Sequence, residues 1–164
     1  MAKNKEEKTN VMRVLEQKKI AYTAHTYPHE EGMAVDGVTV AKSMGFDPAI
    51  VFKTLVARGA SKQYYVFDVP VAEHLDLKKA AKAVGEKSIE MIHQKELLPL
   101  TGYVHGGCSP VGMKKLFPTV FHSSAENLAA MIVSAGKIGY QVEVAPQALI
   151  ALVRAGTAEL TIES

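Results

Sequence analysis

The chain has 164 residues, 48% of them hydrophobic, which is enough to bury one substantial core and too few for two typical domains. Its net charge of +2 argues against a protein that holds nucleic acid by bulk electrostatics, although a local basic face stays compatible with this charge. A single cysteine excludes an internal disulfide, and no apolar run approaches the roughly 20 residues of a membrane helix. We therefore expect one cytoplasmic domain, residues 1–164, with no membrane association.

Hydrophobic periodicity in the first half of the chain predicts two helices, a strand and a β-hairpin. Asp36 stands near the start of the second helix and Gly45 follows its end, as capping residues do. The expected elements are a helix from Thr9 or Asn10 to about Lys19, a strand over 21–27 that Pro28 stops, a helix over 38–44, and hairpin strands over 51–57 and 63–69.

Lys53 is the unusual residue of this hairpin. Side chains alternate along a strand, so Lys53 shares a face with Val51, Leu55 and Ala57. A buried ammonium must find partners or lose its proton. Two readings stay open: an edge-strand lysine whose stem covers apolar surface with its charge in water, or a cleft lysine aimed at a carbonyl or phosphate.

The second half interleaves short helices and strands without a regular βαβ rhythm. A helix capped by Asp76 and closed by Gly85 is expected to turn Leu77, Ala80, Ala81 and Val84 inward and leave Lys78, Lys79 and Lys82 outside. The other expected elements are a strand in SIEMI, a helix in HQKELLPL, strands over 119–121, 131–133 and 140–144, a helical turn around 125–128, a helix over 146–153 and a final extended AELTI. The order predicts an α/β (α+β) fold, a mixed sheet wrapped by short helices.

The segment TGYVHGGCSPVGMKK, residues 101–115, places four glycines and the lone cysteine between two apolar segments. Glycine lets a ligand approach the main chain, so N–H groups of this loop are candidate donors; a plain connection that needs glycine to turn is the alternative. The spacing from Gly107 fits the start of a phosphate loop, but Met113 and Lys114 follow where Lys and Ser or Thr are required. A nucleotide triphosphate or NAD site is therefore not expected.

His25 and His29 do not form a metal site in this reading. Pro28 lies between them, which rules out a shared helical face, and no acidic or cysteine ligand stands beside them. We expect neither a metal nor a cofactor.

Three segments, FKTLV, TGYVHGGCSPVGMKK and VSAGKIGYQVEVAP, together resemble the YbaK family of trans-editing aminoacyl-tRNA deacylases. The resemblance covers nearly the whole chain and is closest to the branch that hydrolyses Cys-tRNA(Pro), which also has HTYPH and DLKKAAKAVG elements. It implies the fold of the editing domain of prolyl-tRNA synthetase, with a partly barrel-like mixed sheet and a cleft between the lysine strand and two Gly-bearing turns.

The resemblance also implies roles for matching positions. Lys53 would be the catalytic lysine of the cleft. The implied substrate-binding residues are Tyr27, Phe52, Thr54, Gly106, Gly107, Ser109, Pro110, Ser134, Gly136 and Gln141. Two departures stand out: Ile138 replaces an arginine of the family's Gly-Gly-Lys-Arg-Gly turn, and Gln141 replaces an acidic residue of some relatives.

The implied partner is the acceptor end of an aminoacyl-tRNA, with prolyl-tRNA synthetase as a possible second partner and the oligomeric state open. In this branch the thiol of the cysteine substrate attacks its own ester, so the protein supplies positioning and donors and no nucleophile. Two alternatives remain: a hydrolase with Cys108 as nucleophile, and a non-catalytic module that keeps the cleft but acts through a partner protein.

Overall fold

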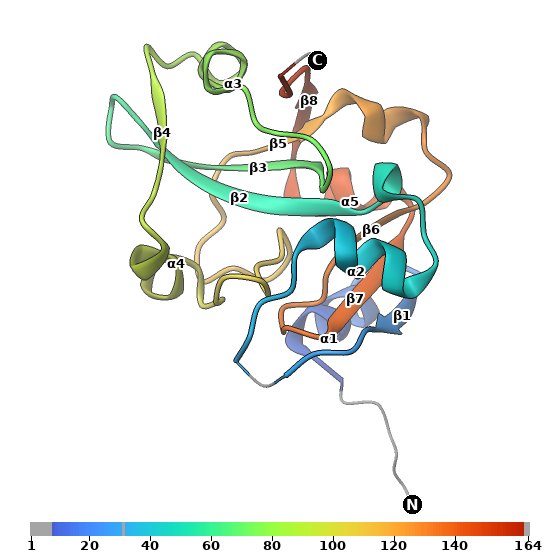
Figure 1. The fold of residues 1–164 in the computed structure, drawn as a ribbon. Helices are drawn as coiled ribbons and strands as arrows, with labels where there is room; N and C mark the ends of the chain where they lie inside the picture. Colours follow the sequence, from blue (N-terminus) through green and yellow to red (C-terminus); the bar gives the residue numbers. More distant parts are fainter. Residues whose placement is uncertain (1–7, 31, 163–164) are drawn as a thin grey trace, which may run out of the picture.

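The structure is a computed structural model that describes residues 8–30 and 32–162. It contains five α-helices and eight strands among these residues (Figure 1). The helices are α1 (Asn10–Gln17), α2 (Gly37–Met44), α3 (Leu77–Val84), α4 (Gln94–Thr101) and α5 (Pro146–Val153). The strands are β1 (Tyr22–Thr26), β2 (Phe52–Gly59), β3 (Tyr64–Pro70), β4 (Ile89–Met91), β5 (Thr119–His122), β6 (Met131–Ser134), β7 (Tyr140–Val144) and β8 (Gly156–Ala158).

The strands form two sheets. A five-stranded sheet has the order β4-β2-β3-β5-β8, and a three-stranded antiparallel sheet has the order β1-β7-β6. The larger sheet is mixed, because β5 pairs in parallel with β3 and β8 while β2 pairs antiparallel with β3 and β4. An isolated bridge between Val51 and Ile132 links the two sheets. The mixed α/β prediction is confirmed, whereas the partly barrel-like description is not confirmed, because the described strands form no closed sheet.

The helices begin and end where the sequence predicts capping. The Thr9 side chain accepts a hydrogen bond from the Met12 N–H at α1, and Asp36 accepts from the Thr39 N–H at α2. Gly45 ends α2 in the left-handed region, with φ of 80°. None of the helices among residues 8–30 and 32–162 has the length and apolarity to cross a membrane.

Helix α3 differs from the prediction at two residues. Leu77 is exposed, because it opens the helix and the packed residues lie one turn later, at Ala80 and Ala81. Lys79 does not belong to a free outer stripe, since its ammonium donates to the Thr161 carbonyl at 2.8 Å. Of the AELTI segment, predicted to be extended, Ala158 ends β8 and Thr161 forms an isolated bridge with Leu75.

The hairpin of β2 and β3 separates two parts of the core. Phe52 and Val56 pack on one face with α1 and α5, while Ala57 packs on the other face with residues of α3. The sheet is therefore apolar on both sides, and the rows of β2 alternate as the sequence predicts. Lys53 and Thr54 are the two polar side chains at the start of this buried strand, one on each face.

Candidate functional site

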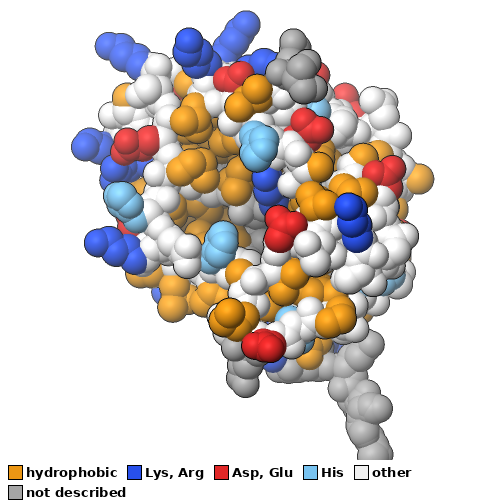
Figure 2. Space-filling model, in the orientation of Figure 1, with side chains coloured by type: hydrophobic (Ala, Val, Ile, Leu, Met, Phe, Trp, Pro, Cys, Tyr) orange, Lys and Arg blue, Asp and Glu red, His pale blue; other side chains and the backbone are white. Residues whose placement is uncertain are grey.

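A cavity of about 360 Å³ lies beside the first half of β2. Its walls come from the β1–α2 connection, α2, β2, α4, the glycine loop of residues 101–115, and the facing ends of β6 and β7. Figure 2 shows the hollow in the middle of one face, with hydrophobic, histidine and acidic side chains around it and a basic side chain inside it. Lys53 is the one Lys or Arg among the residues that line the cavity.

The cavity exists because one edge of β2 is only partly covered. On that edge β4 pairs with Ala57–Gly59, and near the start of β2 only the Val51–Ile132 bridge is present. The Val71 N–H donates to the Val51 carbonyl. In this antiparallel register, the N–H and C=O groups of odd-numbered residues in β2 point to β3, and those of even-numbered residues point to the other edge of the strand. The N–H and C=O of Thr54 therefore point to an edge where no described strand pairs with them.

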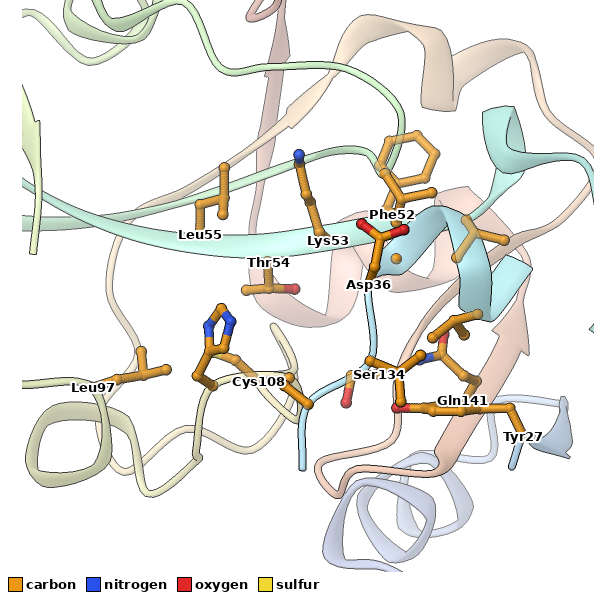
Figure 3. A pocket seen from close by; sticks show the side chains of 18 residues that line it. Tyr27, Asp36, Phe52, Lys53, Thr54, Leu55, Leu97, Cys108, Ser134 and Gln141 are labelled. Carbon is orange, nitrogen blue, oxygen red and sulfur yellow. The ribbon is translucent and has the colours of Figure 1, made fainter. Parts of the chain in front are cut away.

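Lys53 is half-buried at this edge. Burial lowers the pKa of its ammonium, and the charges of Asp36 and Glu73 oppose this shift. Asp36 lines the cavity, while its carboxylate also caps α2. In Figure 3 Lys53 and Leu55 point to one side of β2 and Thr54 points to the other. A cation that is partly stripped of water binds an anionic or carbonyl oxygen more strongly than an exposed lysine does.

Thr54 connects the cavity to a buried acid on the neighbouring strand. Its hydroxyl donates to Oδ1 of Asp68 at 2.5 Å, directly across the β2–β3 pair. Asp68 is completely buried, and its second oxygen, Oδ2, has no hydrogen-bond partner. Burial raises the pKa of Asp68 to about 7, with the Thr54 hydrogen bond acting in the opposite direction.

The glycine loop reaches the cavity through Gly106, which has φ of +90°. A Cβ at Gly106 would lie 2.7 Å from the Cβ of Ala34, so this glycine allows the loop to touch the β1–α2 connection. Gly107 does not line the cavity, and its N–H already donates to the Val104 carbonyl at 2.9 Å. The expectation that both glycines offer free main-chain donors is therefore wrong for Gly107.

Three further predicted residues lie behind the cavity wall and do not line it. Ser109 is fully buried and its hydroxyl oxygen accepts a hydrogen bond from the Val111 N–H, which folds the loop back. Pro110 is buried next to it. The Gly136 N–H donates to Oγ of Ser134, so its main-chain donor is also occupied. These residues shape the wall, and direct substrate contact is not what their geometry shows.

The opposite wall carries two polar side chains that face the cavity. Ser134 and Gln141 are cross-strand partners at the ends of β6 and β7, and both line the cavity. Oε1 of Gln141 is buried without a hydrogen-bond partner, so it is available to accept a hydrogen bond from a ligand. Tyr27 lines the same end, with its pKa raised by burial. Ile138, in the turn between β6 and β7, is buried.

Cys108 lines the cavity but is poorly placed to act as a nucleophile. Burial first, and then the charge of Asp68, raises the pKa of its thiol to about 12. The thiol is therefore expected to be protonated at neutral pH, whereas a cysteine nucleophile reacts as the thiolate. No hydrogen bond from a histidine to this thiol is found among the described residues.

Sequence reasoning missed part of this site. Asp68 was unremarkable within YYVFDVPV, although an aspartate in an apolar strand is the same kind of signal that singled out Lys53. Asp36 was identified only as a helix cap, and it also faces Lys53. The cavity also takes in Leu97 and His105. Within the described part of the chain, no group of three or more His, Cys, Asp or Glu side chains could hold a metal ion.

Comparison with known proteins supplies a family. The sequence model of the family described as "Aminoacyl-tRNA editing domain" matches residues 29–152. A protein of Enterococcus faecalis with the name "Putative Cys-tRNA(Pro)/Cys-tRNA(Cys) deacylase EbsC" is 46% identical over 162 residues, which cover 98% of each chain.

Solved structures share the fold at low identity. A crystal structure described as that of "a putative trans-editing enzyme for prolyl tRNA synthetase" superposes with a TM-score of 0.79, at 24% identity, over 93% of this chain and 95% of the other. A hypothetical protein, APE2540, gives a TM-score of 0.81 at 18% identity, over 93% of this chain and 99% of the other.

Proposed function

Because the chain belongs to the aminoacyl-tRNA editing domain family, we propose that it hydrolyses mischarged aminoacyl-tRNA in trans, with Cys-tRNA(Pro) as its preferred substrate. The name of the 46% identical relative supports this choice of amino acid and adds Cys-tRNA(Cys) as a further substrate.

One observation carries the proposal: the cavity combines a desolvated lysine with neutral polar groups and lacks an activated nucleophile. Lys53 offers a cation, Gln141 an unpaired acceptor and Ser134 a hydroxyl, while the thiol of Cys108 is held protonated. An aminoacyl ester is already activated, so positioning and donors to the developing oxyanion are the main requirements for its hydrolysis.

The proposed reaction uses the substrate's own thiol. Its sulfur attacks the ester carbonyl, the bond to the terminal ribose oxygen breaks, and the proton released by the thiol is taken up by that oxygen, so the products are a cyclic thiolactone and tRNA with a free hydroxyl. Holding the thiol against the carbonyl can lower the activation free energy by about 7 kcal/mol or more. The protein then needs to fold the cysteinyl group into the reactive conformation.

The residues at the open edge of β2 fit the charge that develops in this step. Lys53 is proposed to contact the ester oxygen or the terminal phosphate, and the Thr54 N–H faces the same edge as a candidate main-chain donor. Gly106 is the remaining glycine of the loop at the cavity. Donors fixed in place before the reaction stabilise an oxyanion without reorganisation.

The size of the cavity limits which part of the proposed tRNA partner can enter it. About 360 Å³ is at the low end of the range for small-molecule sites, so it suits an aminoacylated terminal nucleoside and excludes a tRNA stem. The rest of the tRNA must lie on the surface, where a net charge of +2 provides little attraction. Prolyl-tRNA synthetase, which would produce the mischarged tRNA in the cytoplasm, is the proposed source of the missing contacts.

A deacylation assay on a panel of charged tRNAs tests the proposal. The full-length protein should release tRNA from Cys-tRNA(Pro) faster than from Ala-tRNA(Pro) or Ser-tRNA(Pro). Lys53→Ala should lose this activity by about 10²- to 10³-fold and Cys108→Ala should retain it. A folded wild-type protein with no deacylation of any member would instead indicate the non-catalytic module.

A further inference from the structure

Asp68 is a buried carboxyl group of the described chain that the proposed reaction leaves unused. It lies on β3 in a row with Val66, is fully buried, and leaves Oδ2 without a partner. Burying a carboxyl group with half of its hydrogen-bonding capacity unmet is unfavourable, and such groups occur where a function requires them. Its other oxygen, Oδ1, accepts a hydrogen bond from Thr54, which lines the cavity.

That hydrogen bond uses the single donor hydrogen of the Thr54 hydroxyl. Oγ1 of Thr54 donates to Oδ1 of Asp68 at 2.5 Å, and Thr54 itself lines the cavity. A threonine hydroxyl has one donor and two acceptor lone pairs. While the Thr54 hydroxyl donates to Asp68, it can present only lone pairs to the cavity.

We propose that Asp68 is a positioning residue, which fixes the Thr54 hydroxyl as a hydrogen-bond acceptor for a donor group of the bound aminoacyl residue. This inference rests on the proposed function. The donor is an N–H of the α-amino group or the S–H of the side chain, because either can donate a hydrogen bond to a lone pair of the Thr54 oxygen.

The surroundings of Asp68 support an acceptor role. Its charge raises the pKa of the Cys108 thiol, which lies on the same side of β2 as Thr54, whereas the cation of Lys53 points to the other side (Figure 3). No described cation forms a salt bridge with Asp68. When Asp68 is ionised, its carboxylate accepts the Thr54 hydrogen bond more strongly, which polarises the hydroxyl and strengthens its oxygen as an acceptor.

Binding of unreactive substrate analogues tests this inference without requiring turnover. The probes are 3′-amino-3′-deoxyadenosine derivatives in which an amide replaces the ester, acylated with cysteine, with alanine or with 3-mercaptopropionic acid. Calorimetry on the full chain should show that Asp68→Asn weakens the cysteinyl probe about tenfold, because the neutral amide oxygen is a weaker acceptor for the Thr54 hydroxyl and the amide NH2 can donate to Thr54 in competition with the ligand. A loss that persists with the alanyl probe identifies the amino group as donor, and a loss that persists with the mercaptopropionyl probe identifies the thiol.

A double-mutant cycle separates positioning from a structural role. If Asp68 acts through the hydroxyl, Asp68→Asn should weaken binding in the wild type and have no further effect in Thr54→Val. Thr54→Ser keeps the hydroxyl and should restore most of the affinity that Thr54→Val loses. Additive effects of Asp68→Asn and Thr54→Val on the cysteinyl probe would overturn the inference.

The outcomes also separate this inference from the proposed function. If the wild type binds the cysteinyl probe and Asp68→Asn binds it equally well, the deacylase proposal stands and the role of Asp68 is wrong. If the wild type binds none of the three probes, both are wrong. A cooperative melt of each variant verifies that a loss of binding does not come from unfolding.

Discussion

The two walls of the cavity differ in what their residues have left to offer a ligand. On the β2 wall, Lys53 and Thr54 present an ammonium, a hydroxyl oxygen and strand-edge peptide groups. On the glycine-loop wall, the Gly107 N–H is bonded within the loop and Gly106 is packed against Ala34. Glycines in a loop therefore do not by themselves make a donor site, because close packing between two connections requires them as well.

The largest effect is expected at the β2 wall. Lys53→Ala should lower kcat for Cys-tRNA(Pro) about 10²- to 10³-fold, the usual loss when one preorganised transition-state donor is removed. Its melting temperature should stay near that of the wild type, since the side chain is only half-buried. Lys87→Ala is the matched control, because Lys87 is exposed and does not line the cavity. Near-normal turnover by Lys53→Ala would show that this lysine only covers apolar surface.

The loop wall should respond through stability. Gly106→Ala combines a φ of +90° with a Cβ that would lie 2.7 Å from the Ala34 Cβ, so we expect a loss of about 2–4 kcal/mol in the free energy of unfolding. Gly45→Ala is the control, since it has φ of +80° and open space around the added Cβ. It should lose only about 1 kcal/mol. Equal losses in urea unfolding would show that Ala34 yields freely.

Some features of these two walls can be predicted from the sequence and others cannot. The helix ends at Gly45 and Gly85 follow from capping chemistry, because the determinants of a cap lie within a few residues of one another. Lys53 could be identified because a charge in an apolar strand is a local anomaly. The position of Gly107 behind the wall depends on its contact with Ile138, which is distant in sequence, and no local pattern encodes it.

Asp68 illustrates the same limit within one strand. Its type and its place among apolar residues are visible in the sequence, but its partner is Thr54, fourteen positions away, and the pairing depends on the register of the hairpin. A hairpin predicted with an uncertain turn leaves that register open, and a slip of one residue places Asp68 on the opposite face.

A moderate effect of pH on stability is expected from Asp68. Its folded pKa of about 7 exceeds the value of 3.8 for a free aspartate, so the folded state holds the proton longer and the unfolding free energy falls as pH rises from about 4 to 7. Asp68→Asn removes this dependence. Between pH 5 and pH 8 the variant should gain about 2–3 kcal/mol relative to the wild type, measured by urea unfolding. A constant difference across this range would show that Asp68 titrates normally.

The smallest effect is expected at Cys108. Cys108→Ala removes a thiol that is protonated at neutral pH, so deacylation of Cys-tRNA(Pro) should change by no more than a few-fold. The variant loses a small buried group and should melt slightly earlier than the wild type. A loss of about 100-fold or more, in a protein that melts cooperatively, would place the nucleophile on the protein.

The most direct test of the central claim, that the substrate supplies the nucleophile, compares cysteinyl-tRNA(Pro) with seryl-tRNA(Pro) in single-turnover deacylation. A thiol with a pKa near 8.5 is a few per cent ionised at neutral pH, whereas an alcohol is not, so exchanging sulfur for oxygen removes the attacking group. The account predicts that the serine ester reacts much more slowly at the same enzyme concentration, in the wild type and in Cys108→Ala alike. Equal rates for the two esters, or a covalent aminoacyl adduct trapped on Cys108, would contradict it.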